Sequence, residues 1–388
     1  MSVNPLVKLT ESGQSIWYDG IERALINSGE LTRLIDECEI RGVTSNPTIF
    51  EKAIDNSVEY SDQLREQAER QMSASEIYES LAVRDIQMAA DLLAPVFEKT
   101  DGTDGFVSLE CSPLLAHDRA ATIEEVHRLW RVLDRKNVMV KIPATYEGFP
   151  AIQCVYEGIN INVTLIFSLQ SYKKTIEAYL RGLERRVEDG KPIDRIASVA
   201  SFFVSRIDTA GDKRLQERIA RTGSAVEKEK LEPLLGRMAI ANAKTAYQIF
   251  KEVFHSKRFA TFRTRGARVQ RPLWASTSAK NPAYPDVYYV EALIGPETVN
   301  TLPPGTLKAF QDHGRVRISL EEKLEEEAAV LARLEEVGIK LDEVTQQVLD
   351  EGVSLFFRSF EKLMTAIKSQ GDEIVSGLRS SQSATAPD

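Results

Sequence analysis

The sequence predicts an α/β protein built as a (β/α)8 TIM barrel with additional C-terminal helices. Short apolar runs alternate with longer segments in which apolar residues recur every three or four positions, a pattern typical of strands alternating with helices. Eight such runs favour a closed barrel over an open doubly wound sheet. The chain also lacks the GxGxxG turn that opens the dinucleotide-binding form of the open sheet.

The eight apolar runs are the expected strands. Each is short and bounded by charged residues, glycine or proline, as strands usually are. In chain order they are SIWYD (15–19), GVTSNP (42–47), FVSLEC (106–111), VMVKIPA (138–144), INVTLIF (161–167), IASVASFFVS (196–205), PLWAST (272–277) and VYYVEALIG (287–295).

The segments between these runs are expected to be helices that cover the barrel. Residues 123–133 carry a single apolar stripe, whereas residues 55–98 are too long for one barrel helix and predict two or more. Beyond the eighth run, residues 319–338 and 341–367 predict two further helices, and the second should pack across the barrel. Gly338 is the expected C-terminal cap of the first.

These patterns predict one barrel domain over residues 1–375, in which the extra helices start at about residue 318. Residues 376–388 are small and polar and are expected to be a disordered tail.

Composition excludes several classes of protein. The net charge of -9 and the pI of about 5.3 disfavour a dedicated nucleic-acid binder. No signal peptide or membrane-spanning run is evident, and Cys38, Cys111 and Cys154 lack metal-ligand spacing. A reduced cytoplasmic compartment is the simplest interpretation, with a monomer or a homodimer expected. Only four histidines are present, and none forms an HExxH or HxH motif, which argues against a histidine-rich metal site but does not exclude a carboxylate site. No metal is predicted among the site residues.

Most of the apolar runs end in polar residues. In a parallel barrel the reacting groups lie at the carboxyl ends of the strands, so these residues are the candidate site. In strand order they are Asp19; Ser45 and Asn46; Glu110; Lys141; Asn162 and Thr164; Ser201 and Arg206; Ser276, Thr277, Ser278 and Lys280; and Glu291, which is more readily interpreted as a structural partner.

Lys141 decides the chemistry of this set. Taken alone, a lysine in an apolar strand is more often an edge residue that reaches to water than a reacting group. If it points into a barrel, however, it meets Asp19 and Glu110 at the rim. A lysine in a poorly solvated site favours its neutral form, and a neutral amine can attack a ketone and form a Schiff base.

The other strand-end residues suit the same reaction. Two carboxylates can divide acid and base work, and amide and hydroxyl side chains can hydrogen-bond substrate hydroxyls. Arg206 and Lys280 can bind a phosphate. No metal or other cofactor is needed for this chemistry.

Six motifs, in order along the chain, resemble those of the transaldolase family. They are GVTSNPTIF, VSLECSP, NVMVKIPAT, ININVTLIFS, SFFVSRID and LWASTSAKNP, which with the first strand cover residues 15 to about 295. The longer chain and WASTSAKNP are similar to the longer bacterial branch. The resemblance implies a class I aldolase-type barrel of the pentose phosphate pathway. Such enzymes move a dihydroxyacetone unit from fructose 6-phosphate or sedoheptulose 7-phosphate to erythrose 4-phosphate or glyceraldehyde 3-phosphate.

The resemblance also implies the role of each site residue. It makes Lys141 the Schiff-base lysine, and Glu110 a proton shuttle acting through a water held with Thr164. It makes Asp19 the base that accepts the proton of the donor's C4 hydroxyl. Among the binding groups, Asn46, Asn162 and Ser276 would hold the dihydroxyacetone hydroxyls, Ser201 would line the pocket, and Arg206 would bind the phosphate.

One position departs from the shorter members of the family. They carry an arginine two residues after the position of Ser276, where this chain has Ser278. We expect Lys280 to supply the second phosphate-binding cation, with a nearby arginine as the alternative. The candidates are Arg263, Arg265, Arg268 and Arg271, most of which are more readily interpreted as a solvated loop.

Three alternative functions stay open at this point. A related class I sugar-phosphate aldolase would release free dihydroxyacetone, although family members of that kind have a different residue in place of Glu110. A non-catalytic sugar-phosphate-binding barrel would be expected to lack the lysine or a carboxylate, and all three are present. A metal-dependent barrel lyase or isomerase would lose its activity in excess chelator.

Overall fold

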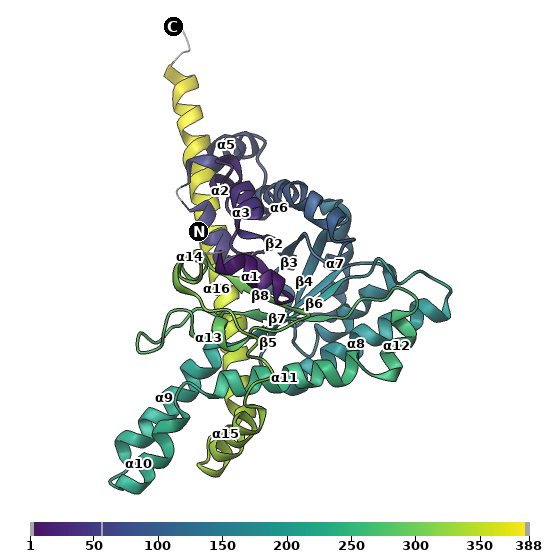
Figure 1. Ribbon diagram of the computed structural model, residues 1–388. Helices are drawn as coiled ribbons and strands as arrows, with labels where there is room; N and C mark the ends of the chain where they lie inside the picture. The colour runs from purple at the N-terminus through teal and green to yellow at the C-terminus, as the bar shows by residue number, and fades with distance from the viewer. Residues whose placement is uncertain (1–3, 56, 385–388) are drawn as a thin grey trace.

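The computed structural model describes residues 4–55 and 57–384 and confirms the predicted (β/α)8 barrel (Figure 1). All the neighbouring strands are parallel, and the sheet closes in the order β1-β2-β3-β4-β5-β6-β7-β8. The strands are β1 (Gln14–Asp19), β2 (Ile40–Thr44), β3 (Phe106–Glu110), β4 (Val138–Pro143), β5 (Ile161–Ile166), β6 (Ser198–Phe203), β7 (Arg271–Ala275) and β8 (Thr298–Leu302).

Helices surround the barrel and connect its strands (Figure 1). Up to β5 they are α1 (Pro5–Glu11), α2 (Arg23–Asn27), α3 (Glu30–Cys38), α4 (Pro47–Ile54), η1 (Val58–Tyr60), α5 (Ser61–Glu69), α6 (Ala74–Lys99), η2 (Pro113–Leu115), α7 (Arg119–Leu133) and η3 (Phe149–Glu157). After β5 they are α8 (Leu169–Glu188), α9 (Ser205–Arg221), α10 (Ala225–Leu231), η4 (Glu232–Leu234), α11 (Met238–Phe254), α12 (Lys257–Arg263), α13 (Tyr288–Ala292), α14 (Pro304–His313), α15 (Leu324–Glu336) and α16 (Leu341–Ala384).

The prediction for the eighth strand is wrong. Residues 287–295 contain the short helix α13, and the strand that closes the barrel is β8, a few residues later. A short apolar run does not distinguish a buried strand from a buried helix, because both bury their side chains continuously. The β8 run TVNTL has two β-branched threonines and a valine, which is a strand signal that its polar residues conceal.

The register of the strands brings the predicted site residues together. Glu110 on β3 pairs with Lys141 on β4, and Lys141 pairs with Asn162 on β5. Thr164, two residues after Asn162 on β5, points to the same face as Asn162 and lies nearer the rim, where it pairs with Pro143 of β4. Because adjacent parallel strands present paired residues side by side, three polar groups meet at one level of the barrel.

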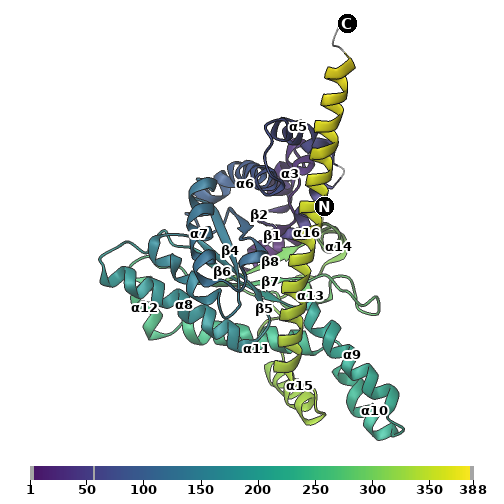
Figure 2. The same cartoon turned by 180° about the vertical axis from the view of Figure 1, so that it is seen from behind.

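Two helices lie across opposite ends of the barrel. The short helix α1 lies over the end seen in Figure 1, and its Leu6 and Leu9 are fully buried. The view from behind, Figure 2, shows the long helix α16 running across the other face of the molecule. It packs against α4, α5, α6, α9 and β5. The prediction that this C-terminal helix packs across the barrel is confirmed.

The helix α16 is held to the barrel by specific contacts. Thr48 of α4 and Ser359 of α16 are 2.9 Å apart through their hydroxyl oxygens, and Arg214 of α9 donates to Gln347 at 2.7 Å. The helix α16 continues to Ala384, so it extends into residues 376–388, which were predicted to be a disordered tail. Residues 385–388 lie outside the described residues.

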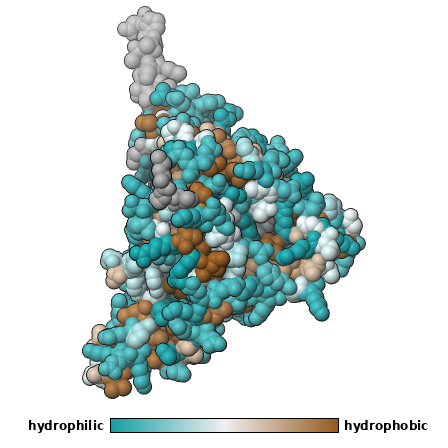
Figure 3. All heavy atoms as spheres, in the orientation of Figure 1, coloured by the Kyte–Doolittle hydropathy of each residue, from teal (hydrophilic) through white to brown (hydrophobic). Residues whose placement is uncertain are grey.

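The surface seen in Figure 3 is mostly hydrophilic, and its hydrophobic residues form small separate patches. In the described ranges, no helix has the length and apolar character needed to cross a membrane. The large apolar groups are instead concentrated in one core cluster that includes residues of every strand.

Candidate active site

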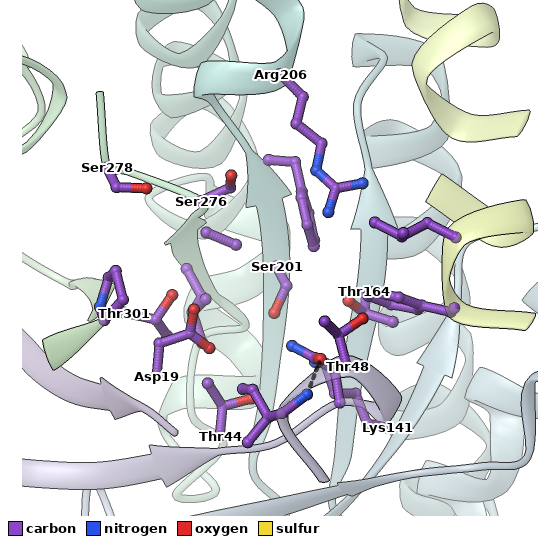
Figure 4. A pocket seen from close by; sticks show the side chains of 18 of the residues that line it. Asp19, Thr44, Thr48, Lys141, Thr164, Ser201, Arg206, Ser276, Ser278 and Thr301 are labelled. Carbon is purple, nitrogen blue, oxygen red and sulfur yellow. Dashed lines mark hydrogen bonds between the residues drawn. The ribbon is translucent and has the colours of Figure 1, made fainter. Parts of the chain in front are cut away.

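A cavity of about 320 Å³ opens at the carboxyl ends of the strands. Figure 4 shows its side chains converging from strands and helices that are far apart in the sequence. Eight of the ten predicted site residues line it: Asp19, Asn46, Lys141, Thr164, Ser201, Arg206, Ser276 and Lys280. The other two are also buried: Glu110 lies beside Lys141, and Asn162 is hydrogen-bonded to Ser201.

Lys141 is held at the floor of this cavity. Only 4% of the residue is exposed, and its Nζ donates a hydrogen bond to the carbonyl oxygen of Ser45 at 3.0 Å. The same Nζ lies 3.3 Å from Oε2 of Glu110. The amine is therefore fixed in position, beside one carboxylate and facing the cavity.

Glu110 lies next to Lys141 and is buried, but it does not line the cavity. Burial raises the pKa of its carboxyl group, and the neighbouring Lys141 opposes that shift. Within the described part of the chain, Oγ1 of Thr164 has no hydrogen-bond partner, and Oε2 of Glu110 has none apart from its ion pair with Lys141. Buried polar atoms are normally satisfied, so two such oxygens near one buried lysine indicate a place for a small polar molecule.

Asp19 ends β1 and also lines the cavity. Burial raises the pKa of its carboxyl group, whereas the positive charges of Lys141, Lys280 and Arg206 act to lower it. In the described ranges it makes no direct ion pair. Its carboxylate is thus available to a substrate, and it can accept a proton more readily than an exposed aspartate.

The two asparagines have different surroundings. Asn46 caps α4, and its Oδ1 accepts from the backbone N–H of Ile49 at 3.0 Å, which leaves the Nδ2 amide to donate to a ligand. Asn162 donates to Ser108 at 3.0 Å and accepts from Ser201 at 2.7 Å. Asn162 therefore fixes the orientation of Ser201 as well as lying beside Lys141.

The positive side chain of Arg206 enters the cavity on the side opposite Lys141, and Lys280 lines the same cavity. In Figure 4 the guanidinium group of Arg206, from the first turn of α9, points toward the cavity centre. Burial lowers the pKa of Arg206, and burial together with the charge of Arg206 lowers the pKa of Lys280. Because the charge of Arg206 acts on Lys280 and both residues line the cavity, the two cations can bind one doubly charged phosphate.

The four arginines proposed as alternatives to Lys280 do not line the cavity. Arg271 is at the amino end of β7, where it pairs with Asp104 at 2.8 Å. Arg268 donates to the carbonyl oxygens of Asp101 and Gly102 at the same end, and Arg263 and Arg265 are exposed. The structure therefore leaves Lys280 as the predicted second cation.

The cavity also contains residues that the sequence reasoning missed. They are Thr44, Thr48, Ile49, Lys52, Phe203, Leu273, Ala275, Thr301, Pro303, Leu355 and Phe356. Lys52 adds a third cation from α4, and Thr301 comes from the misplaced eighth strand. Leu355 and Phe356 belong to α16, whose apolar pattern gave no sign that it would face the site. Glu291 is elsewhere, accepting from the backbone N–H of Arg315 at 2.8 Å, which fits the structural role expected for it.

Ser276 has a strained backbone. Its φ is 55°, in the left-handed region that serine rarely adopts. Its Oγ lies 3.1 Å from that of Ser205, and its carbonyl oxygen accepts from the backbone N–H of Ser205 at 3.1 Å. Strain of this kind is typical of functional sites, because it orients a side chain that an ordinary strand would turn elsewhere.

Comparison with known proteins agrees with the geometry. The family model described as Transaldolase/Fructose-6-phosphate aldolase matches residues 16–367. Transaldolase of Trichodesmium erythraeum is 46% identical over 371 residues, which cover 95% of this chain and 98% of that protein. Transaldolase 2 of Nostoc sp. is 46% identical over 372 residues (95% and 98%), and Transaldolase of Acidothermus cellulolyticus is 46% identical over 366 residues (94% and 96%). The chain therefore belongs to the transaldolase/fructose-6-phosphate aldolase family.

Proposed function

We propose that this enzyme is a transaldolase that moves a dihydroxyacetone unit between sugar phosphates through a Schiff base on Lys141. The observation that carries the proposal is the buried Nζ of Lys141, 3.3 Å from Glu110, at the floor of a cavity with cations on its far side. A ketose phosphate fits this arrangement if its carbonyl carbon is at the lysine and its phosphate is at Arg206 and Lys280.

The first steps form the Schiff base. The neutral amine of Lys141 attacks the ketone carbon, and the resulting carbinolamine loses water to give the iminium. Glu110 is placed to exchange the necessary protons, since its raised pKa lets it hold a proton more readily than an exposed glutamate does. The unpartnered oxygens of Glu110 and Thr164 support a bridging water as the carrier of those protons.

Carbon–carbon cleavage follows from the iminium. Asp19 accepts the proton of the C4 hydroxyl, the C3–C4 bond breaks, and the electron pair is delocalised into an enamine on the lysine. The released aldose phosphate leaves, and an acceptor aldose takes its place and reacts with the enamine. Hydrolysis of the new Schiff base then frees the product and the lysine.

The remaining groups bind and orient the substrate. Asn46, Asn162 and Ser276 would bind hydroxyl groups of the retained unit, and Ser201 is held in place by Asn162. Lys52 also lines the cavity, and because its charge acts on Lys280 it can add to the phosphate site of Arg206 and Lys280.

The helix α16 contributes to the site by covering it. Leu355 and Phe356 supply apolar surface at the cavity. Apolar cover limits the access of water to the enamine, which favours transfer to a second sugar over loss of the unit to solvent.

Borohydride trapping tests the position of the Schiff base. The enzyme is reduced in the presence of fructose 6-phosphate, and the adduct is located by peptide mapping. We expect a reduced dihydroxyacetone adduct on Lys141. An adduct on a different lysine, or none at all, would show that the mechanism is wrong.

A coupled assay separates transfer from simple aldol cleavage. Formation of glyceraldehyde 3-phosphate from fructose 6-phosphate is followed with and without erythrose 4-phosphate. A transaldolase requires the acceptor for continued turnover, whereas a fructose-6-phosphate aldolase releases dihydroxyacetone without it. Sustained turnover without the acceptor would assign the chain to the aldolase branch of its family.

A further inference from the structure

Three metal-ligating side chains meet outside the active site, between α7 and η3. They are His127, Cys154 and Glu157, and each offers one ligand atom within 4.8 Å of the other two. Nε2 of His127 lies 3.8 Å from Sγ of Cys154 and is also in direct contact with Oε2 of Glu157. We propose that these three residues form a zinc site that ties η3 to α7.

Local geometry explains why the three residues meet. Cys154 and Glu157 are three positions apart in η3, and side chains at this spacing in a 3-10 helix lie one above the other. Helix α7 packs directly against η3 and presents His127 to this pair. The spacing of the cysteines in the sequence could not reveal such a site, because its ligands come from two separate elements.

The donor set favours zinc over other common ions. One sulfur, one imidazole nitrogen and one carboxylate oxygen suit zinc, whereas calcium and magnesium prefer oxygen ligands. In a tetrahedral site the nitrogen and sulfur ligands of one zinc are roughly 3.5 Å apart. The observed 3.8 Å between His127 and Cys154 is close to that separation, whereas His127 and Glu157 touch one another and must move apart to admit the ion.

The surroundings also suit an ion that enters from solvent. Cys154 is buried, with 4% of the residue exposed, and the imidazole of His127 and the carboxylate of Glu157 lie near its thiol. The side chains of His127 and Glu157 are 30% and 48% exposed, which leaves a fourth position to water. On binding, the thiol loses its proton to solvent and the thiolate coordinates the ion.

The position of the site indicates a structural role. Glu157 ends η3 shortly before β5 begins, so the cluster is displaced toward the amino end of the strands. Active sites of these barrels lie at the other end, and contacts near the amino end contribute mainly to stability. Zinc bound here would clamp the segment that links β4, which carries Lys141, to β5.

Calorimetric titration of metal-free, full-length enzyme with zinc tests the proposal. We expect one equivalent to bind and to raise the melting temperature. The variants Cys154→Ser and His127→Gln should each weaken binding by about 100-fold or more. His313→Gln is the matched control, since His313 is an exposed histidine beside Asp286 and Asp312 without a cysteine. It should bind zinc as the wild type does.

Cobalt provides a readout specific for the thiolate. The wild-type protein loaded with cobalt should show a thiolate-to-metal charge-transfer band that the Cys154→Ser variant lacks. If that variant fails to fold, Glu157→Gln replaces it in the titration, and X-ray absorption of the wild type should show one sulfur at about 2.3 Å from zinc. Unchanged affinity in the cluster variants, or absence of the sulfur signal, would overturn the site whatever the outcome for transaldolase activity.

Discussion

The two ends of the barrel both bury charged side chains, but only one end satisfies them within the protein. At the amino end, Arg271 pairs with Asp104 at 2.8 Å and donates to Ser15 at 2.7 Å. Ser15 in turn donates to the other oxygen of Asp104 at 2.7 Å. Each charge in this group, which we call the amino-end network, therefore has hydrogen-bonded partners.

At the carboxyl end the charges are left partly unsatisfied. Lys141 and Glu110 are 3.3 Å apart, yet Oε2 of Glu110 has no hydrogen-bond partner in the described ranges. Asp19 and Arg206 are half-buried and Lys280 is exposed, all three line the cavity, and loss of contact with water is the first cause of each pKa shift. The difference indicates that the amino-end network stabilises the folded chain, whereas the carboxyl-end charges are arranged for a ligand.

The substitution with the largest expected effect is Lys141→Ala. Without the amine no Schiff base forms, so turnover should fall at least on the order of 10⁴-fold. The melting temperature should change little, because Glu110 can take up a proton once the lysine is gone. Transfer assays and thermal unfolding of the same preparation measure both quantities.

Lys244→Ala is the matched control for Lys141→Ala. Lys244 is also a buried lysine, and its Nζ donates to the carbonyl oxygen of Glu322 at 2.8 Å, but it does not line the cavity. This variant should keep its turnover number while losing stability. A steep loss of melting temperature in Lys141→Ala itself would make Lys141 a structural residue instead.

Asp19→Asn should lower activity and raise stability. Losing the base should reduce kcat by about 10²- to 10⁴-fold. The folded pKa of Asp19 is raised above its ordinary 3.8, so the folded state binds this proton more tightly than the unfolded chain does. Its contribution to stability is therefore greatest at a pH below 3.8 and is lost as the pH rises through the folded pKa. Asparagine cannot ionise, so the Asp19→Asn variant does not lose this stability as the pH rises.

The measurement is the melting temperature of wild type and variant as a function of pH. The difference in favour of Asp19→Asn should grow from near pH 4 upward and then become constant. A variant less stable than wild type at neutral pH would mean that the carboxylate of Asp19 is satisfied in the folded protein, as those of the amino-end network are.

Asp104→Ala tests the other end of the barrel. Removing one partner of a buried, hydrogen-bonded ion pair leaves Arg271 uncompensated and should cost about 3–5 kcal/mol in the free energy of unfolding. Denaturant unfolding measures this loss. The folded fraction should retain the wild-type kcat, and a selective loss of kcat would disprove the proposed separation of the two ends.

The smallest effects are expected at the phosphate site. Arg206→Gln and Lys280→Gln each remove a charge-assisted hydrogen bond worth about 1.5–3 kcal/mol, which corresponds to roughly a 10- to 100-fold rise in KM. Steady-state kinetics with fructose 6-phosphate measure this change. Arg268→Gln, at the opposite end of β7, is the control and should leave KM unchanged. A rise in KM for this variant would mean that Arg268, and not Lys280, is the second phosphate-binding cation.

Much of the fold was predictable because hydrophobic periodicity is a local property. Seven of the eight apolar runs overlap the strands of the barrel, and the two predicted C-terminal helices correspond to α15 and α16. The eighth run failed because continuous burial produces the same apolar pattern in α13 as in a strand.

The candidate site was predictable to a similar degree. Polar residues at strand ends are visible in the sequence, and the barrel necessarily brings those ends to one rim. Lys52, Leu355 and Phe356 were not predictable, since nothing local distinguishes them from other helix residues that face a neighbour. The arginines after residue 262 could not be excluded from the sequence as the second phosphate-binding cation, because their distance from the cavity depends on the direction of β7.

The sequence by itself therefore determined the barrel, the order of its strand-end residues and the resemblance on which we propose Lys141 as the reacting lysine. Only the tertiary structure decided which strand closes the barrel, that α16 covers the cavity and that His127 meets Cys154. These features depend on contacts between residues far apart in the chain, whereas the sequence patterns arise from the burial of each segment separately.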